Sequence, residues 1–532
     1  MTFFRNKTAE EKAKFYKIAI ILVLLLGIAV KCIKFGVLMD QTQSDEMGCG
    51  YDAYCLLHYG TDRYGYSWPV YFINYGGGQN ALYTYVCVLT IKLLGYSKFA
   101  IRLPALLFSI MGGIVGTFLT GQLTKDADKK PKAMLLFAIL YAVAPYTFMA
   151  SRFALESNLM FSCSTVFLYF LVRAHREKKN LFYLFAGIFA GITLYTYAIA
   201  YIVLPVMLLF AIIYMVITRQ ISFLNVILFV IPLAILATPL ILVQYVNYFD
   251  KEQFQLGIFT ITKFREYRSG EISFNDFFPG IFKGYFSVLC YDGLGYNTNK
   301  NFFTFYPMSI PFFFYGFYLL VKRAIVSIKE NSIDGNVLVF FWVIGETLVA
   351  GLMTEPNTNR MNGLIFPVMF MTILGIYTII DKFPEKFVLP SWCTLAAVYG
   401  IYFIIFLYSY FTVIAWQRVT TSSMCPEGYQ YIQENDALKE KVVVTNIPPQ
   451  FFAATALPSP DKVDYDGNYK DEKYAWFNTY EYPTLRDYFY NVGGVAPVYL
   501  IYNPTDDDKA VMEECGAKTE RFGYSFYLYY WN

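Results

Sequence analysis

The chain has 532 residues, of which 56% are hydrophobic, 20% aromatic and only 16% charged. With a mean hydropathy of +0.40, this composition indicates a protein whose solvent is largely lipid. The nine cysteines include no C-x-x-C pair and only two histidines are present, which argues against a zinc site. The net charge of +3 says little by itself, and no basic aromatic groove for nucleic acid occurs.

The first long apolar run, residues 18–38, has basic flanks and a poor cleavage region, so it predicts an anchor rather than a removed signal peptide. A window of about 20 residues, the length that crosses hydrocarbon, finds about eleven spans. They lie near residues 18–38, 103–122, 134–150, 157–172, 181–197, 199–217, 221–243, 307–321, 336–353, 362–380 and 389–414. The predicted fold class is a polytopic α-helical membrane protein.

Basic residues decide the orientation of these spans. They gather near the N-terminus and in alternate connections, at Lys125, Lys129, Lys130 and Lys132, at Arg173, Arg176, Lys178 and Lys179, at Arg219, at Lys322, Arg323 and Lys329, and at Lys382 and Lys386. Because cytoplasmic loops carry an excess of Lys and Arg, the sequence predicts a cytoplasmic N-terminus and an extracytoplasmic C-terminus.

One further apolar segment, residues 81–94, is short and interrupted by Lys92. Counting it as a crossing would place the basic cluster at 125–132 outside, so we expect a helix that lies in the outer interface. When residues 81–94 are not counted as a crossing, four stretches share the outer face: residues 39–102, 152–158, 244–306 and 354–362. We therefore expect a shared outer site on a membrane domain of residues 1–416.

After Trp416 the composition changes and no spanning segment follows. Apolar runs at 441–445, 498–502 and 524–531 predict strands, and residues 506–515 predict a helix that stops at a glycine. Residues 417–532 therefore predict a small extracytoplasmic α/β domain. In this domain Cys425 and Cys515 either pair or stay free, and Trp476, Tyr480 and Tyr482 either stack on sugars or belong to its core.

The acidic pair Asp45-Glu46 lies just beyond the first apolar run. A carboxylate tolerates hydrocarbon poorly, so one that lies where a span meets water usually marks a pathway or a reaction centre. Asp45 is the candidate general base for an incoming hydroxyl, with Glu46 as its orienting partner. The alternative is that both residues end the span and remain solvated, and Asp40 is an alternative helix cap.

Two arginines on the predicted outer side, Arg152 and Arg360, lie apart from any acidic run. The planar, permanently charged fork of arginine suits a phosphate, so the pair predicts a phosphate at the membrane surface. The alternatives are snorkelling to lipid head groups or structural pairs with Glu156 and Glu355. Arg102, at the start of the second span, predicts an interfacial anchor instead.

The glycine run Gly76-Gly77-Gly78 lacks the G-x-x-x-x-G-K-[ST] pattern and follows no buried strand, so it predicts a flexible turn. No kinase motif set and no G-x-S-x-G nucleophile elbow occurs. His58 lies in the same outer stretch but is single, and a structural histidine is the simpler interpretation.

The outer stretch at 39–102 resembles a known family through one set of residues: Asp45-Glu46, Gly50-Tyr51-Asp52-Ala53-Tyr54, Gly60-Thr61-Asp62-Arg63-Tyr64-Gly65, Trp68-Pro69-Val70, Leu82-Tyr83-Thr84-Tyr85, Gly95 and Arg102-Leu103-Pro104. This set is similar to the first outer loop of the GT-C glycosyltransferases. It is most similar to the bacterial relatives of protein O-mannosyltransferases and of the aminoarabinose transferase that modifies lipid A, in glycosyltransferase family 39 and its neighbours. The resemblance covers residues 15–380.

The resemblance implies a membrane enzyme that passes a sugar, of hexosyl or mannosyl type, from a polyprenyl phosphate to an acceptor hydroxyl outside the cell. It makes Asp45 the catalytic carboxylate beside Glu46, and it makes Arg152 and Arg360 contacts to the carrier phosphate. The further substrate-binding candidates are Asp52, His58, Gln79 and Glu156. One departure is the segment Gln79-Asn80-Ala81-Leu82-Tyr83, where many relatives have a lysine before Pro-Pro-Leu-Tyr.

The expected reaction inverts the anomeric carbon and uses neither a cofactor nor a metal. The alternative of a hard divalent cation held by Asp45, Glu46 and Asp52 stays open. The acceptor is a glycan, a lipid or a protein.

The rival class is a polytopic transporter or a flippase for lipid-linked glycans, but such proteins usually carry charge near mid-membrane, whereas here charge gathers at one outer rim. A receptor or scaffold that binds through its tail is a second rival.

Overall fold

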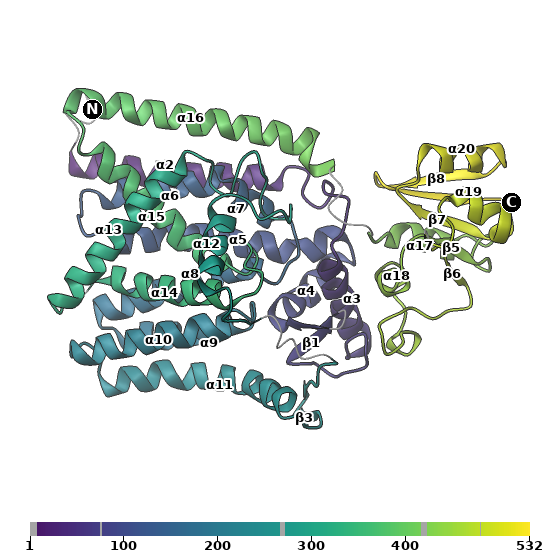
Figure 1. The fold of residues 1–532 in the computed structure, drawn as a ribbon, viewed down its shortest axis with the longest axis horizontal. Helices are drawn as coiled ribbons and strands as arrows, with labels where there is room; N and C mark the ends of the chain where they lie inside the picture. Colours follow the sequence, from purple (N-terminus) through teal and green to yellow (C-terminus); the bar gives the residue numbers. More distant parts are fainter. Residues whose placement is uncertain are drawn as a thin grey trace. The chain divides into compact units, whose positions relative to one another are not determined.

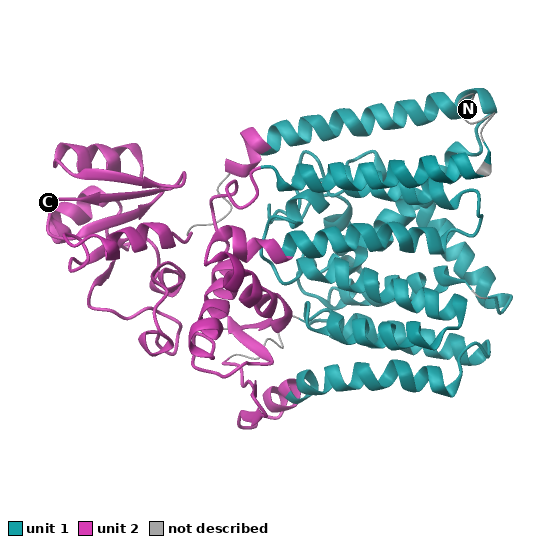
Figure 2. Ribbon diagram, turned by 180° about the vertical axis from the view of Figure 1, so that it is seen from behind, with its two compact units in different colours: residues 1–33, 105–242, 268–410 teal, residues 34–104, 243–267, 411–532 magenta. Residues whose placement is uncertain are grey.

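The computed structural model describes residues 8–74, 77–265, 272–332, 334–416, 423–478 and 480–531. Gly76 of the predicted glycine turn and residues 417–422, the predicted start of the tail, lie outside the described residues. The chain forms two compact units, shown in different colours in Figure 2: unit 1 comprises residues 1–33, 105–242 and 268–410, and unit 2 comprises residues 34–104, 243–267 and 411–532. These units cut across the predicted boundary at residue 416, and the predicted functional domains stay a prediction.

Unit 1 is built mainly from apolar helices, whose long members lie side by side in Figure 1. They are α2 (Ala9–Cys32), α5 (Lys98–Leu123), α6 (Lys130–Val143), α7 (Pro145–Ala150), α8 (Asn158–Glu177), α9 (Asn180–Leu194), α10 (Ala200–Ile217), α11 (Phe223–Tyr248), α12 (Phe277–Leu289), α13 (Ser309–Lys329), α14 (Gly335–Leu352), α15 (Ile365–Ile380) and α16 (Glu385–Thr412). A short 3₁₀ turn, η2 (Asn362–Leu364), leads into α15.

Every predicted span overlaps a helix, which confirms the multi-pass membrane fold, although α2 ends at Cys32, before the predicted end at residue 38. In the described part of the chain, eight helices are long and apolar enough to cross a membrane: α2, α5, α10, α11, α13, α14, α15 with η2, and α16. The other three predicted spans differ for local reasons. Pro145 lacks an N–H and begins a new helix after α6, α9 has only 15 residues, and α8 carries several serine and threonine residues.

Apolar side chains cover the outside of unit 1 as well as its interior. Ile235 on α11 and Ile404 on α16 are 66% and 68% exposed, whereas Met369 and Phe370 on α15 are fully buried. Exposed apolar ridges of this extent are unfavourable in water and favourable in lipid. The burial pattern therefore makes α15 a central helix and α11 and α16 lipid-facing ones.

The tightest helix crossing in unit 1 joins α13 and α15. A Cβ on Gly316 would collide with the backbone carbonyl of Met371, and a Cβ on Gly375 would collide with that of Phe312. Each glycine thus lets the opposite backbone approach closely. Small residues serve this purpose in membranes, where helices associate through packing rather than through a hydrophobic driving force.

The predicted cytoplasmic loops gather at one end of unit 1. Lys125, after α5, lies 2.9 Å from Asp334, which caps α14. Lys129 and Lys132, before and within α6, each lie 3.1 Å from Asp381, which follows α15. The loops that the basic residues assign to one side therefore share one end of the helix bundle, while the identity of that side stays a prediction.

Unit 2 combines two helices, small sheets and the C-terminal segment. Its first part holds α3 (Ser44–Tyr59), β1 (Tyr71–Asn74), β2 (Gly77–Asn80) and α4 (Ala81–Leu94), and its second part holds the β3 (Phe254–Leu256) and β4 (Phe259–Ile261) hairpin. The bounds of α4 match the predicted interfacial helix. In β1 and β2, which are antiparallel, Phe72 is paired with Gln79 and Asn74 with Gly77.

The tail forms the predicted small α/β domain. Its elements are η3 (Ile414–Trp416), α17 (Pro426–Glu434), β5 (Val443–Thr445), α18 (Pro449–Ala456), η4 (Pro460–Lys462), β6 (Tyr474–Trp476), α19 (Leu485–Tyr488), η5 (Phe489–Gly493), β7 (Val498–Tyr502), α20 (Asp506–Glu514), β8 (Lys518–Phe522) and β9 (Phe526–Tyr530). The sheet order is β6-β5-β7-β9-β8, parallel on the β6 side and antiparallel on the β8 side. Central strand β7 is buried along its whole length. Tyr482 packs against this core, whereas Tyr480 is exposed.

Replacing Gly316 by leucine should separate α13 from α15 and lower the free energy of unfolding by about 1–3 kcal/mol or more, as overpacking does. The matched control is Gly400→Leu on α16, where, beyond the local helix itself, none of the described residues comes within 4 Å of the added Cβ. Thermal unfolding of both variants in mild detergent measures the difference. Equal losses in the two variants would contradict the close crossing.

Candidate functional site

Asp45 lies in the first turn of α3, where the helix itself fixes its backbone. Gln43 is the N-cap, and the Glu46 carboxylate accepts the Gln43 N–H at 3.0 Å in a capping box. Acidic side chains are stabilised in this turn by the positive end of the helix dipole. The alternative in which Asp40 caps the helix is wrong, because Gln43 occupies that position.

The Asp45 carboxylate is half-buried and is held by two amide groups. Asn74, at the end of β1, donates to Oδ1 at 3.1 Å, and Gln43 donates to Oδ2 at 3.3 Å. Both donors are amides, and they orient the carboxylate. Partial exposure and a fixed orientation are what a general base requires.

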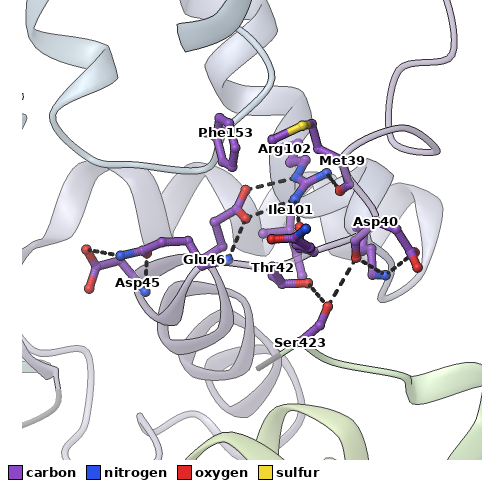
Figure 3. A network of polar contacts seen from close by, with 12 residues as sticks. Met39, Asp40, Thr42, Asp45, Glu46, Ile101, Arg102, Phe153 and Ser423 are labelled. Atoms are coloured by element: carbon purple, nitrogen blue, oxygen red, sulfur yellow. Dashed lines mark hydrogen bonds and ion pairs between the residues drawn. The ribbon is translucent and has the colours of Figure 1, made fainter. Parts of the chain in front are cut away.

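Glu46 binds Arg102 in the network of Figure 3. Its oxygens accept from Nε at 2.9 Å and from Nη2 at 3.0 Å. The same guanidinium donates to the carbonyl oxygens of Met39 and Gln41, each at 2.6 Å. Both charged side chains are at most 1% exposed. The prediction of an interfacial anchor at Arg102 is therefore wrong, because this guanidinium is buried against the chain that leads into α3.

Asp52, a predicted substrate-binding residue, is fully buried and bonded to a neighbour. Arg63 donates Nε to Oδ1 at 2.8 Å and Nη2 to Oδ2 at 2.7 Å. The Arg63 backbone N–H adds a third bond, at 3.1 Å. A carboxylate engaged in this bidentate way is committed to its partner, and a role for Asp52 in substrate binding stays a prediction.

Asp40 joins the segment before α3 to the C-terminal domain. Its Oδ1 accepts from Lys98 at 2.7 Å, and its Oδ2 accepts from the N–H of Tyr524, between β8 and β9, at 3.2 Å. Ser423 donates to the Asp40 carbonyl at 3.1 Å and lies 3.0 Å from the Thr42 hydroxyl (Figure 3). Burial raises the pKa of the Asp40 carboxyl, but the charge and hydrogen bond of Lys98, with the hydrogen bonds from Ser525 and the Tyr524 N–H, outweigh burial and hold it below its ordinary value.

Gln79, in β2, lies on the same face of its hairpin as Asn74. It pairs across the strands with Phe72, and side chains two apart in a strand share a face. Gln79 is 2% exposed, and its Oε1 has no hydrogen-bond partner in the described part of the chain. A buried acceptor of this kind is costly unless something donates to it, so Gln79 offers an acceptor to a bound group.

Arg152, in unit 1, is 1% exposed and packs against the end of α2. Its Nη1 donates to the carbonyl oxygens of Lys31 at 2.8 Å and Ile33 at 3.0 Å. The guanidinium also lies over the rings of Phe148 and Tyr410, at 5.2 and 5.5 Å. Positive charge is favourable at a helix C-terminus, so Arg152 places a fixed cation at the predicted outer end of α2.

Arg360, also in unit 1, is half-buried and donates Nη1 to the carbonyl oxygen of Glu355 at 3.1 Å. Next to it, Asn359 accepts from Asn297 at 2.7 Å, and Asn297 also donates to Asn158 at 2.8 Å. Three loops that are far apart in the sequence thus meet at the end of unit 1 opposite the basic loops. These are the stretches that the sequence assigns to the outer face.

The predicted site residues fall into two groups, one in each unit. Asp45, Glu46, Asp52, Gln79 and His58 belong to unit 2, and Arg152, Glu156 and Arg360 belong to unit 1. His58 is exposed at the last turn of α3, with its ring 4.2 Å from that of Tyr54. Glu156 is half-buried in the turn before α8.

No group of three His, Cys, Asp or Glu that could hold a metal occurs among the described residues, and the metal question stays a prediction. Cys425 and Cys515 are free thiols.

Sequence reasoning missed Glu346, in the middle of α14. This side chain is fully buried, and neither carboxylate oxygen has a hydrogen-bond partner in the described part of the chain. Gly363 leaves it room, since a Cβ there would collide with Oε1. A single Glu within an apolar run is the signal that could have found it, because ionisable residues inside spans are rare.

Comparison with known proteins identifies the fold. The family model described as dolichyl-phosphate-mannose-protein mannosyltransferase matches residues 80–242. ArnT from Cupriavidus metallidurans in the apo state is similar with a TM-score of 0.50 and 12% identity, over 96% of this chain and 97% of that one. The chain has a GT-C fold. The oligosaccharyltransferase AglB from Archaeoglobus fulgidus, solved with an inhibitory peptide and a dolichol-phosphate, is also similar, with a TM-score of 0.51, 10% identity and coverage of 92% and 70%.

The GT-C fold and the family-39-like resemblance predicted from the sequence are thus confirmed at the level of fold. The search of curated proteins found no match to the chain. The family model begins at Asn80, so its match includes Arg102, Arg152 and Glu156 but not Asp45. The role of Asp45 therefore rests on its position and on the contacts described above.

Arg102→Met should lower the free energy of unfolding by about 3–5 kcal/mol, because Glu46 would keep a buried charge without its partner. The matched control is Arg173→Met, whose bidentate pair with Glu177 has bonds of 2.7 and 3.2 Å but side chains 26% and 29% exposed. An exposed pair of this kind contributes about 0–1 kcal/mol. Unfolding in mild detergent measures the loss of stability in both variants. Similar losses would contradict a stabilising role for the buried Glu46–Arg102 ion pair.

Asp62 should make stability depend on pH. Burial, and then the charge of Asp52, raise the pKa of the Asp62 carboxyl to about 8. An unfolded aspartate titrates near pH 4, so between about pH 4 and 8 the native state binds a proton that the unfolded chain releases. This contribution is complete below about pH 4 and is lost as pH rises through 8. Asp62→Asn should flatten the decline in unfolding temperature between pH 5 and 8.5. An unchanged decline would show that Asp62 is not the source of this pH dependence.

Proposed function

We propose that this chain is a membrane glycosyltransferase that transfers a sugar from a polyprenyl-phosphate donor to an acceptor hydroxyl on the extracytoplasmic side. The observation that carries the proposal is the half-buried Asp45 carboxylate at the start of α3, oriented by Asn74 and Gln43. The match to the mannosyltransferase family model and the GT-C fold support it. In AglB, a protein of this fold, a dolichol-phosphate is bound.

The reaction follows from the charge and position of Asp45. Its carboxylate accepts the proton of the acceptor hydroxyl as the oxygen attacks the anomeric carbon of the donor sugar. The bond from that carbon to the phosphate oxygen breaks, and the polyprenyl phosphate leaves with the bonding electrons. Because attack and departure occur on opposite faces, the anomeric configuration inverts. Glu46 is bound to Arg102, so it holds the helix start and takes no proton.

Stabilising the leaving phosphate requires fixed positive charge. Arg152 and Arg360 are the candidates, since both lie at the predicted outer end of unit 1, and a preorganised cation in a water-poor site is worth about 3 kcal/mol or more to the transition state. Gln79 replaces the lysine that many relatives have in the first loop, and its buried Oε1 suits a sugar hydroxyl better than a phosphate. In this proposal the arginines carry the phosphate and Gln79 binds the sugar.

The proposal includes the orientation predicted from the basic loops, with the N-terminus in the cytoplasm and the C-terminal domain outside. It needs no cofactor and no metal, and activity that survives EDTA is the expected result. The sugar is of hexosyl or mannosyl type, and the acceptor is a glycan, a lipid or a protein. Mass spectrometry of surface glycans from cells with and without the gene would name the product.

The alternative function is a transporter or a flippase for lipid-linked glycans, and Glu346 is the observation that favours it. A carboxyl buried within a span is the kind of group that marks a transport pathway. The two functions separate in detergent, where no gradient exists. Release of labelled sugar from a polyprenyl-phosphate donor by purified protein supports the transferase, and binding without release supports the flippase.

Asp45→Asn should reduce transfer by about 10²–10⁴-fold, the usual contribution of a general base, while leaving the protein inserted and folded. The control is Asp436→Asn, whose side chain is 92% exposed in the C-terminal domain. Transfer is measured with membranes and a panel of labelled polyprenyl-phosphate sugars. Near-normal turnover in Asp45→Asn would remove Asp45 from the role of base.

A further inference from the structure

Asn74 connects the candidate base to a buried ion pair behind it. Its Nδ2 donates to Asp45 Oδ1 at 3.1 Å, and its Oδ1 accepts from Arg63 Nη2 at 3.4 Å. Arg63 is in turn held by the two carboxylate oxygens of Asp52, at 2.8 and 2.7 Å. Asn74 is 6% exposed, and Arg63 and Asp52 are at most 1% exposed, so this chain of contacts runs inward from Asp45.

The charge on Arg63 fixes which way the Asn74 amide points. A guanidinium only donates hydrogen bonds, so the amide atom that faces Arg63 must be the carbonyl oxygen. The NH₂ group must then face Asp45, where a carboxylate only accepts. A flipped amide would place a donor against a donor and an acceptor against an acceptor. The buried ion pair therefore determines the orientation of Asn74, a β1 side chain that binds Asp45.

Gly48, one turn after Asp45 on α3, makes room for this arrangement. A Cβ at this position would collide with Asn74 Oδ1 and would lie 2.6 Å from Arg63 Nη2. Any other residue would push the amide and the guanidinium away from α3. The absence of a side chain at Gly48 is thus a condition for the contact between β1 and the start of α3.

We propose that Asn74 is a positioning residue for Asp45, held in one orientation by the Arg63–Asp52 pair and seated against Gly48. It keeps the Asp45 carboxylate in one orientation. The catalytic meaning of this role rests on the proposed function of Asp45. The physical coupling between Asn74 and Asp45 does not depend on that function, and it can be measured without a substrate.

Several charged groups of the described residues lie on the elements that surround the start of α3. Glu46 pairs with Arg102, Asp52 with Arg63 and Asp40 with Lys98; Asp62 lies near Asp52; α4 carries Lys92 in its last turn; and α18 has no charged residue. In Asn74→Asp, Arg63 would face two carboxylates, and Asp45 would lose its amide donor and gain a negatively charged neighbour. Gly48→Ala adds no charge, so it separates the loss of the donor from the effect of the added charge.

The experiment measures carbodiimide labelling of Asp45 in the purified full-length protein as a function of pH, read by fragment-ion mass spectrometry. Carbodiimide modifies the protonated carboxyl, so labelling falls as Asp45 ionises. In Asn74→Asp a second carboxylate replaces the donor. The lost hydrogen bond and the added negative charge should together raise the pH of half-maximal labelling by about 1 unit or more. Gly48→Ala, which displaces Asn74 without altering its chemistry, should raise it in the same direction.

The matched control is Asn446→Asp, an amide in the C-terminal domain that bonds to the backbone of Tyr502, and it should leave the Asp45 midpoint unchanged. Size-exclusion profiles confirm the fold of each variant. A midpoint that is unchanged in both Asn74→Asp and Gly48→Ala would overturn the proposal. A shifted midpoint together with normal turnover in Asp45→Asn would instead keep the coupling and remove the catalytic role of Asp45.

Discussion

The buried ion pair between Glu46 and Arg102 is the contact on which the candidate site depends. One guanidinium binds both oxygens of the carboxylate and the carbonyl oxygens of Met39 and Gln41. The start of α3, the start of α5 and the segment between α2 and α3 are thus tied to one point. Two charges removed from water are held only by such complete hydrogen bonding. The position of Asp45, next to Glu46, follows directly from this constraint.

The C-terminal domain belongs to the same compact unit as the first outer loop because it bonds to that loop at several points. Tyr51 donates to the carbonyl of Pro458 at 2.8 Å, and Tyr96 donates to that of Ala454 at 3.1 Å. Together with the Asp40 contacts to Ser423 and Tyr524, these bonds place α18 against α3. The domain therefore supports the helix that carries Asp45, whatever else it binds.

Local physics made most of the fold predictable. Apolar runs located the spans, because crossing hydrocarbon fixes their length, and strand β7 and helix α4 match their predicted residues. The predictions are wrong or missing where the position of a side chain depends on a partner that is distant in the sequence. The sequence predicts an anchor at Arg102 because Glu46 is 56 residues away and no sequence pattern joins the two residues. The same holds for Asn74, which is 29 residues from Asp45. Arg63, only 11 residues from Asp52, stands in a motif that resembles the family.

The central claim is that Asp45 faces the extracytoplasmic side at the start of α3. Cysteine accessibility tests it most directly, with Asp45→Cys and Lys130→Cys compared in a background without exposed native cysteines. In intact cells a membrane-impermeant maleimide should label position 45, whereas position 130, the first residue of α6 beside the basic loop that follows α5, should react only after permeabilisation. Labelling of position 45 only after permeabilisation would contradict the account.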